Sequence, residues 1–231
     1  MPLPPIEVTV SSRNPHKLTE LRALLEPYGY RLSTAADRGV PEVPEDGATF
    51  VDNALLKARA AFEVTGGVCL ADDTGLVVDA LGGAPGVYSA RFAGPAATYA
   101  DNNRLLLERL AGVPLEAREA AFVTSVVVLV PAPLAASLTT DAADLGGAGA
   151  LVRDDVPAGA TAFLAEGRVA GRILTTPRGA EGFGYDPLFL HPPTGLTFAE
   201  LPAGQKNTLS HRALAFQALG RLLRALSEGR T

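Results

Sequence analysis

The chain has 231 residues, 47% of them hydrophobic, and is therefore long enough to bury one sizeable core. Twenty Lys and Arg residues against 25 Asp and Glu residues leave a net charge of −5, which argues against broad binding to a polymeric nucleic acid. No window approaches the roughly 18 apolar residues of a membrane span, and residues 1–5 lack the pattern of a signal peptide. We therefore expect a cytoplasmic protein without membrane contact.

The first half of the chain predicts two strand-and-helix units. An apolar, β-branched run predicts a strand over 6–11, and Asn14 followed by Pro15 marks the start of a helix over 15–26. A second helical pattern covers 49–65. Two short strands are expected after it, over 68–71 and 76–80.

The second half predicts strands followed by a long helix. The near-continuous apolar run over 121–130 is typical of a strand covered on both faces. Residues 162–164 and 168–174 are expected to pair as an antiparallel unit. A final helix over 210–227 would turn Leu214, Ala218, Leu222 and Leu226 inward.

The order of these elements predicts a mixed α/β class. Between 131 and 159 the composition shifts to Ala, Gly, Pro and Asp without a regular period, which indicates an irregular excursion or a long hairpin tip. No linker divides the chain into separately patterned halves. We expect one domain over 1–231, formed by two lobes around a cleft.

The first polar motif is Ser12-Arg13-Asn14-Pro15-His16-Lys17, at the predicted turn from strand to helix. A helix N-terminus offers N–H groups and a positive dipole end, so phosphate oxygens can dock beside Asn14 and Lys17. The alternative is an Asn cap followed by a solvated lysine. This motif alone favours the alternative, because neither glycine-rich phosphate-binding pattern occurs in the chain.

The second motif is Asp72-Asp73-Thr74-Gly75, directly after an apolar strand. Carboxylates at a strand end suit a hard cation, and Mg2+ usually binds one or two carboxylates together with substrate phosphates. Glu45, in a separate loop, is a second candidate ligand. The alternative is an ordinary Asp-Asp turn.

The third motif combines aromatic residues with glycines over 181–187, followed by a polar segment over 206–212. An aromatic ring among glycines can stack on a flat ligand. His211 and Arg212 can donate to the 6-keto oxygen of a purine, whereas adenine has an amino group at that position, which would not accept. The alternative is a Ser210-capped helix with two solvated cations in its first turn. The helix dipole disfavours cations at that place.

Taken together and in this order, the motifs resemble the Ham1/RdgB/ITPA family of inosine and xanthosine triphosphate pyrophosphatases. The resemblance extends over nearly the whole chain and includes 12–17, 45–57, 71–76, 83–92, 182–189 and 206–212. It implies an ITPase-like α/β fold, a homodimer, dependence on Mg2+, and a preference for ITP, dITP and XTP over ATP and GTP.

The resemblance also implies roles for individual residues. Asp73 is the expected proton acceptor and, with Glu45, a metal ligand. Asp72 is the alternative candidate for the role given to Asp73. Attack at the α-phosphorus would yield monophosphate and pyrophosphate. The implied substrate contacts are Ser12, Arg13, Asn14, Pro15, His16, Lys17, Lys57, Thr74, Phe183, Gly184, Tyr185, Asp186, Lys206, His211 and Arg212.

The sequence departs from the family pattern at three places. Ser12-Arg13 replaces the usual Thr-Gly, and Arg13 adds bulk where glycine normally lets the backbone turn. Thr74 stands where Ser is usual, and the 131–159 excursion is longer and richer in Ala. Two other functions stay open: a Maf-like pyrophosphatase acting on other modified nucleotides, and a nucleotide-binding module without catalysis.

Overall fold

The computed structural model describes residues 6–136, 138 and 148–228, and its contacts divide the chain into two compact units. Unit 1 comprises the described residues of Met1–Asp73, Ser125–Glu166 and Leu214–Thr231. Unit 2 comprises Thr74–Thr124 and Gly167–Ala213. The prediction of a single domain over the whole chain stays a prediction.

Unit 1 is built on a mixed sheet with the strand order β2-β1-β3-β4-β6, and β5 pairs antiparallel with β6. Strand β1 runs parallel to both β2 and β3, with Val8 opposite Leu32 and Val68. The mixed α/β class predicted from the sequence is confirmed. The bounds are β1 Glu7–Val10, β2 Arg31–Thr34, β3 Val68–Val78, β4 Glu119–Pro131, β5 Gly149–Leu151 and β6 Ala160–Ile173.

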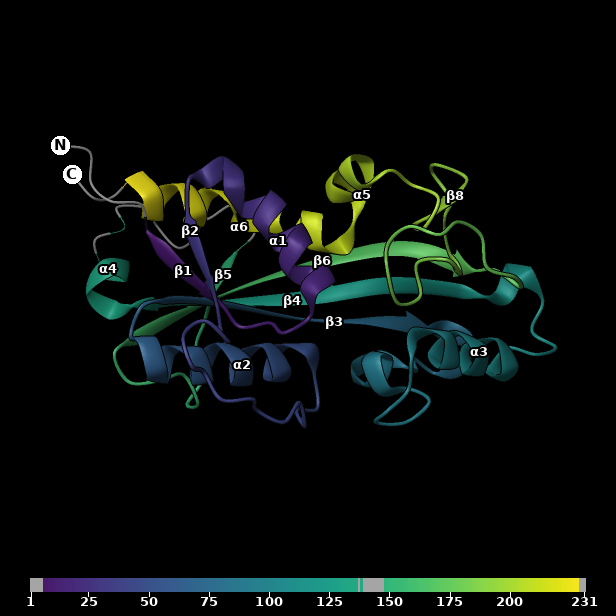
Figure 1. Cartoon of the computed structure of the whole chain (residues 1–231), viewed down its shortest axis with the longest axis horizontal. Coiled ribbons are helices and arrows are strands. Elements are labelled where there is room, and N and C mark those ends of the chain that lie inside the picture. Colours follow the sequence, from purple (N-terminus) through teal and green to yellow (C-terminus); the bar gives the residue numbers. More distant parts are fainter. Residues whose placement is uncertain (1–5, 137, 139–147, 229–231) are drawn as a thin grey trace. The chain divides into compact units, whose positions relative to one another are not determined.

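Helices cover both faces of the unit 1 sheet (Figure 1). Helices α1 (Pro15–Leu25) and α6 (His211–Glu228) lie on one face, and α2 (Phe50–Thr65) lies on the other. Alternate residues of β3 divide between the faces: Val68 and Leu70 join the α1/α6 core, whereas Cys69 and Ala71 join the α2 core.

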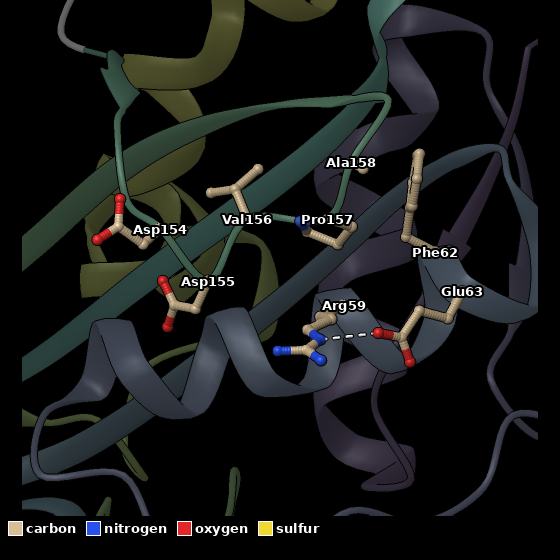
Figure 2. Close-up of a pocket in the computed structure, with 8 residues that line it drawn as sticks. All are labelled: Arg59, Phe62, Glu63, Asp154, Asp155, Val156, Pro157 and Ala158. Carbon is tan, nitrogen blue, oxygen red and sulfur yellow. Dashed lines mark hydrogen bonds and ion pairs between the residues drawn. The ribbon is translucent and has the colours of Figure 1, made fainter.

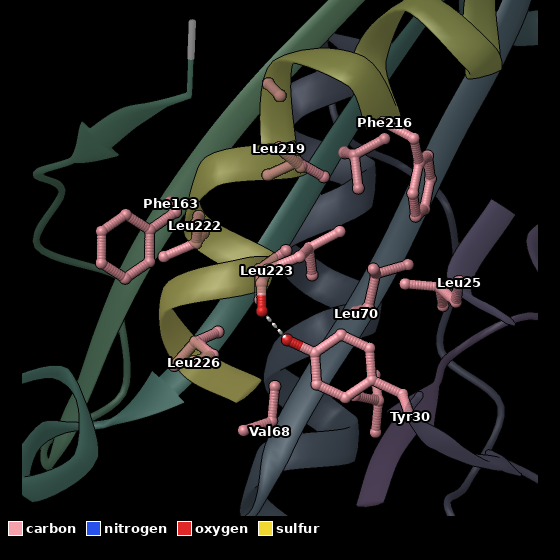
Figure 3. Close-up of a cluster of buried hydrophobic side chains, with 14 of the residues drawn as sticks. Leu25, Tyr30, Val68, Leu70, Phe163, Phe216, Leu219, Leu222, Leu223 and Leu226 are labelled. Carbon is pink, nitrogen blue, oxygen red and sulfur yellow. Dashed lines mark hydrogen bonds between the residues drawn. The ribbon is translucent and has the colours of Figure 1, made fainter. Parts of the chain in front are cut away.

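The α1/α6 core depends on the apolar face of α6 (Figure 3). Leu219, Leu222 and Leu226 are fully buried, and the Tyr30 hydroxyl donates to the Leu223 carbonyl. The predicted inward position of Leu214 is wrong, since this residue is 37% exposed. The buried stripe runs through Ala215 and Leu219, one residue further along the helix.

Unit 2 contains the sheet order β3-β4-β6-β7-β8, with β7 at Phe189–His191 and β8 at Leu196–Thr197. Its core is aromatic: the ring centroid of Phe122 lies 4.6 Å from that of Phe189 and 5.8 Å from that of Phe198. The remaining helices of this unit are α3 Tyr99–Arg109 and α5 Ala203–Leu209, with short 3-10 turns at Asp79–Leu81, Gly86–Arg91 and Leu115–Ala117.

Helices α2 and α3 begin with the same capping box. The Thr49 hydroxyl accepts from the Asp52 N–H, and the Asp52 carboxylate accepts from the Thr49 N–H. Thr98 and Asp101 repeat this arrangement in α3. Each threonine satisfies backbone donors that an uncapped helix leaves unpaired.

Two predicted breaks in strands are wrong. Residues 68–71 and 76–80 belong to the single strand β3, so Asp72 and Asp73 lie within a strand instead of at its end. Residues 162–164 and 168–174 do not form a hairpin, because β6 runs unbroken over 14 residues. Buried and exposed residues alternate through its centre, from Ala165 to Gly171, as expected for a strand with one covered face.

The described part of the 131–159 excursion contains two short elements. Helix α4 spans Ala132–Ala136, and β5 returns to pair with β6. Residues 137 and 139–147 of this predicted segment lie outside the described residues. In the part of the chain that the structure describes, no helix is both long enough and apolar enough to cross a membrane.

Candidate functional site

Three predicted site residues of unit 1, Lys17, Glu45 and Lys57, meet Asp72 and Asp73 at the centre of β3. Because successive side chains of a strand point to opposite faces, Asp72 points toward the α1 face and Asp73 toward the α2 face. Each carboxylate therefore meets a different lysine, and the two residues that sequence reasoning could not separate have different surroundings.

Asp72 forms an ion pair with Lys17. The Lys17 Nζ lies 3.0 Å from Asp72 Oδ2, and the exposed fractions of the two side chains are 15% and 0%. The alternative of a solvated lysine is therefore wrong. Lys17 is the third residue of α1, so the strand-to-helix turn brings its ammonium group over the sheet.

The start of α1 is capped by Asn14, as predicted. Asn14 Oδ1 accepts from the N–H groups of His16 and Lys17, and the Asn14 carbonyl accepts from the Leu18 N–H. Pro15 has no N–H group. The N–H groups of His16, Lys17 and Leu18 therefore have an acceptor on Asn14, which is the cap that the alternative expected.

The other residues of this turn have local roles. The Ser12 hydroxyl accepts from the Asn14 N–H, and one Arg13 guanidinium N–H donates to the Val40 carbonyl at 3.2 Å. His16 is exposed. No non-glycine residue in the described ranges has a positive φ, so Arg13 stands at the usual glycine position without left-handed backbone strain.

Asp73 faces a second lysine on α2. Lys57 Nζ lies 3.6 Å from Asp73 Oδ1 and 2.7 Å from Glu45 Oε1, and it donates to the Asp72 carbonyl at 2.7 Å. Burial lowers the pKa of Lys57, but attraction to Asp73, Glu45 and Asp72 outweighs this effect, so the pKa lies above its ordinary value. Lys57 therefore stays charged at neutral pH.

The Asp73 carboxyl is less acidic than a free aspartate. Burial raises its pKa, while Lys57 and Lys17 lower it and the charge of Glu45 raises it again; the net shift is upward. A carboxylate with a raised pKa is a better proton acceptor than an ordinary one. This upward shift of the pKa suits the Asp73 carboxylate to accept a proton.

Sequence reasoning gave no role to Asn53, which the structure adds to this site. Asn53 is fully buried, and its Nδ2 donates to Asp73 Oδ2 at 3.0 Å. The signal was present in the sequence: Asn53 precedes Lys57 by four residues, so both lie on one face of the predicted helix.

The donor set suits a divalent cation together with a substrate. Glu45 and Asp73 converge on one ammonium group, which shows that their carboxylates can share a cation. Within the described ranges, no group of three or more His, Cys, Asp and Glu side chains is arranged to hold a metal. Two carboxylates with substrate phosphates are a usual set for Mg2+, so these residues fit that ion.

Among the predicted residues of unit 2, Asp186 and Lys206 form a buried ion pair beside Phe183. Lys206 Nζ lies 2.7 Å from Asp186 Oδ2 and 4.9 Å from the centre of the Phe183 ring. The same Asp186 oxygen accepts from the Phe183 N–H at 2.9 Å. The residue before Phe183 must be glycine, because the φ of Gly182 is +76° and a Cβ there would lie 2.2 Å from Asp186 Oδ2.

Neighbouring residues fix the loop that carries Phe183. Tyr185 is 4% exposed and its hydroxyl donates to the Ser89 carbonyl, so its ring packs in the core of unit 2. The Gly184 carbonyl accepts from Asn103 Nδ2 at 3.0 Å. The Phe183 ring, in contrast, is only partly buried.

Arg212 and His211 are buried, so the alternative of two solvated cations is wrong. Arg212 Nη2 donates to Thr74 Oγ1 at 3.3 Å, and Thr74 Oγ1 lies 2.7 Å from Thr124 Oγ1. The His211 ring stacks on the Phe122 ring at 4.9 Å between centroids. Ser210 caps the helix through its hydroxyl, as that alternative also expected.

A cavity of about 490 Å³ lies elsewhere in unit 1 (Figure 2). Figure 2 shows it between Arg59, Phe62 and Glu63 of α2 and the segment Asp154, Asp155, Val156, Pro157 and Ala158. Its lining includes none of the predicted site residues. The candidate residues therefore lie outside this cavity, at the β3 carboxylates of unit 1 and, in unit 2, at the Phe183 loop.

Comparison with known proteins identifies the family of the chain. The Ham1 family model matches residues 8–222. A dITP/XTP pyrophosphatase of Xanthomonas oryzae pv. oryzae is 46% identical over 220 residues, which cover 95% of this chain and 98% of that protein.

Solved structures with a similar fold include a HAM1 protein from Coxiella burnetii, with 35% identity and a TM-score of 0.75 over 96% of this chain and 99% of that one. A nucleoside-triphosphatase, or dITP/XTP pyrophosphatase, from Mycobacterium abscessus has 40% identity and a TM-score of 0.65 over 93% and 98% of the two chains. The chain therefore belongs to the Ham1 family.

Proposed function

We propose that this chain hydrolyses the non-canonical purine nucleotides ITP, dITP and XTP to monophosphate and pyrophosphate, and so removes them from the nucleotide pool. The observation that carries the proposal is the buried Asp73 carboxylate, held between Asn53 and Lys57 in a chain of the Ham1 family. The names of the relatives supply the class of substrate.

Asp73 acts as the base in this proposal. Its raised pKa suits it to take a proton from a water molecule, whose oxygen then attacks the α-phosphorus. The bond from the α-phosphorus to the bridging oxygen breaks, and pyrophosphate leaves with the bonding electrons. Lys17 and Lys57 offset the negative charge that develops on the phosphate oxygens.

The charges of the cluster support a requirement for Mg2+. When ionised, Asp72, Asp73 and Glu45 carry three negative charges, against two positive charges on the lysines, so the cluster is net negative by one. Such a site repels a polyphosphate unless a cation is added. We propose that Glu45 and Asp73 hold Mg2+, which would offset phosphate charge and polarise the phosphoryl group.

Unit 2 would select the base. Stacking on the partly buried Phe183 ring tolerates any base, so discrimination needs a polar group. The donors of His211 and Arg212 suit the 6-keto oxygen of hypoxanthine and xanthine, and adenine has an amino group there. Asp186 and Lys206 hold the Phe183 loop in place through the ion pair described above.

The test is product analysis by anion exchange after incubation with ITP, XTP, dITP, ATP, GTP and dTTP, each with and without Mg2+. Monophosphate and pyrophosphate from ITP, dITP and XTP, only with metal, are the expected result. Orthophosphate would indicate a phosphatase, and faster turnover of dTTP a Maf-like pyrophosphatase. Absence of product with retained nucleotide binding would indicate a module without catalysis.

We further propose a cytoplasmic homodimer, an assembly that the family resemblance implies. Sedimentation equilibrium is expected to give twice the monomer mass. A monomer at micromolar concentration would overturn this part of the proposal without affecting the catalytic part.

A further inference from the structure

We propose that Asn53 is a positioning residue that fixes the rotation of the Asp73 carboxylate, and that the backbone N–H of Gly47 fixes Asn53 in turn. The inference rests on the proposed function, because it concerns the same base. It assigns a role in the reaction to a side chain that is fully buried.

The two hydrogen bonds of the Asn53 amide determine which way it points. Asn53 Oδ1 accepts from the Gly47 N–H at 2.8 Å, while Nδ2 donates to Asp73 Oδ2 at 3.0 Å. A flipped amide would place its NH2 group against the Gly47 N–H and its oxygen against the carboxylate. Both contacts would then be repulsive, so only the observed orientation satisfies both partners.

Gly47 can take this place because it lacks a side chain. A Cβ there would lie 2.6 Å from the Asp52 Cβ and 2.8 Å from Asn53 Oδ1. The loop therefore approaches α2 more closely than any other residue would allow. Glu45 lies two residues earlier in that loop, so one backbone segment supplies both a carboxylate and the N–H that orients Asn53.

The two oxygens of the Asp73 carboxylate therefore have different partners. Oδ2 is engaged by Asn53, while Oδ1 faces Lys57 at 3.6 Å. That separation is longer than the 2.7 Å between Lys57 and Glu45. Without Asn53 the carboxylate can rotate about its χ2 bond toward Lys57, and the oxygen that receives the proton is no longer held in place.

The experiment is a double-mutant cycle on turnover. We expect Asn53→Ala to lower kcat for ITP by about 10- to 100-fold, the usual cost of removing a group that orients a catalytic one. KM, and the affinity for inosine monophosphate measured by calorimetry, should change less than twofold. In an Asp73→Asn background, Asn53→Ala should lower kcat no further, because its effect passes through Asp73.

The matched control is Asn102, another buried asparagine. Its Oδ1 accepts from the Ala93 N–H and its Nδ2 donates to the Ala90 carbonyl, so both bonds go to backbone. Asn102→Ala should lower the thermal midpoint and leave kcat per folded molecule unchanged. If Asn53→Ala does not fold, Gly47→Ala is the second variant. It keeps the Asn53 side chain but displaces the N–H of residue 47, and kcat should fall less than the roughly 10- to 100-fold expected for Asn53→Ala.

Three results are decisive. A fall in kcat that vanishes in the Asp73→Asn background supports the inference. An equal fall in both backgrounds, or an unchanged kcat in folded Asn53→Ala, overturns it while wild-type hydrolysis of ITP upholds the proposed function. Wild-type protein that releases no pyrophosphate from ITP, dITP or XTP overturns the proposed function, and the inference with it.

Discussion

The candidate residues of unit 1 and unit 2 are held by different forces. In unit 1, two lysines and three carboxylates meet on both faces of one strand, and ionic contacts dominate. In unit 2, rings and glycines predominate, and the buried pair of Lys206 and Asp186 lies beside the Phe183 ring. The first arrangement suits the handling of charge and protons, and the second suits recognition of a flat, nearly neutral group.

This difference predicts which kinetic parameter a mutation in each unit should change. Changes in the unit 1 cluster should lower kcat for every base alike, because every nucleotide carries the same triphosphate. Changes in the unit 2 cluster should alter the ratio of rates between bases. The following experiments test this division, from the largest expected effect to the smallest.

Asp73→Asn should show the largest effect. It removes the proton acceptor at constant volume, and we expect kcat to fall by about 1,000-fold for ITP and XTP alike. Pyrophosphate release measures the rate, and circular dichroism checks that the fold persists. Asp72→Asn should cost less, since in this proposal Asp72 holds Lys17 and does not take the proton. The reverse order of the two variants would transfer the role of base to Asp72.

Lys206→Met should destabilise the protein by about 3–5 kcal/mol, because it leaves the buried Asp186 carboxylate without its cation. Urea unfolding measures the free energy. Arg104→Met is the control in the same unit: its ion pairs with Asp101 and Glu108 are exposed, and exposed pairs contribute about 0–1 kcal/mol. An equal loss of unfolding free energy in both variants would contradict the claim that the Lys206–Asp186 pair contributes more to stability because it is buried.

Arg212→Lys should reduce discrimination between bases while keeping the charge. Lysine cannot reproduce the planar set of guanidinium donors, so we expect the ratio of kcat/KM for ITP over ATP to fall about 10-fold. Competition between the two nucleotides in one reaction gives this ratio directly. An unchanged ratio with a lower kcat for both would place Arg212 with the catalytic residues instead.

Thr49→Ala and Thr98→Ala should have the smallest effects. The two threonines cap α2 and α3 in the same way, and loss of a cap costs about 1 kcal/mol. Only α2 carries Asn53 and Lys57, yet kcat should stay near normal in both variants because the interior of α2 is held by packing. A selective fall in kcat for Thr49→Ala would show that the cap also positions the site.

The helices were largely predictable from the sequence, because capping and periodicity are local signals. Asn14-Pro15 marks the start of α1, and the apolar spacing locates α2 and α6 within one or two residues. Helices α3 and α5 and strands β2, β7 and β8 were missed. The signal for α3 was available, since Thr98 and Asp101 have the spacing of a capping box.

The strands were less predictable at their centres. Asp72-Asp73-Thr74-Gly75 has the composition of a turn, but Lys17, Asn53 and Lys57 come from distant segments and stabilise the carboxylates inside β3. No local rule anticipates those partners. The break predicted in β6 was avoidable, because Glu166 and Arg168 alternate with Ala165, Gly167 and Val169 in the sequence, as in an ordinary strand with one covered face.

Sequence motifs located the candidate residues better than they located the contacts. Lys17 and Lys57 were identified, yet their ion pairs with Asp72 and Glu45 depend on how the sheet and helices meet. Asn53 was overlooked because a buried asparagine on a helix resembles any other polar residue until its partners are known. The roles in binding and catalysis stay predictions until the variants are measured.

The assembly of unit 1 from three separate stretches of chain affects its synthesis. A ribosome that has reached Ala213 has already made every residue of the carboxylate cluster, but not the leucines of α6 that fill the core on the Asp72 face of the sheet. The nascent sheet therefore exposes apolar surface to solvent until Leu226 emerges. Protection of that surface by chaperones while α6 is being made would directly affect the yield of folded protein.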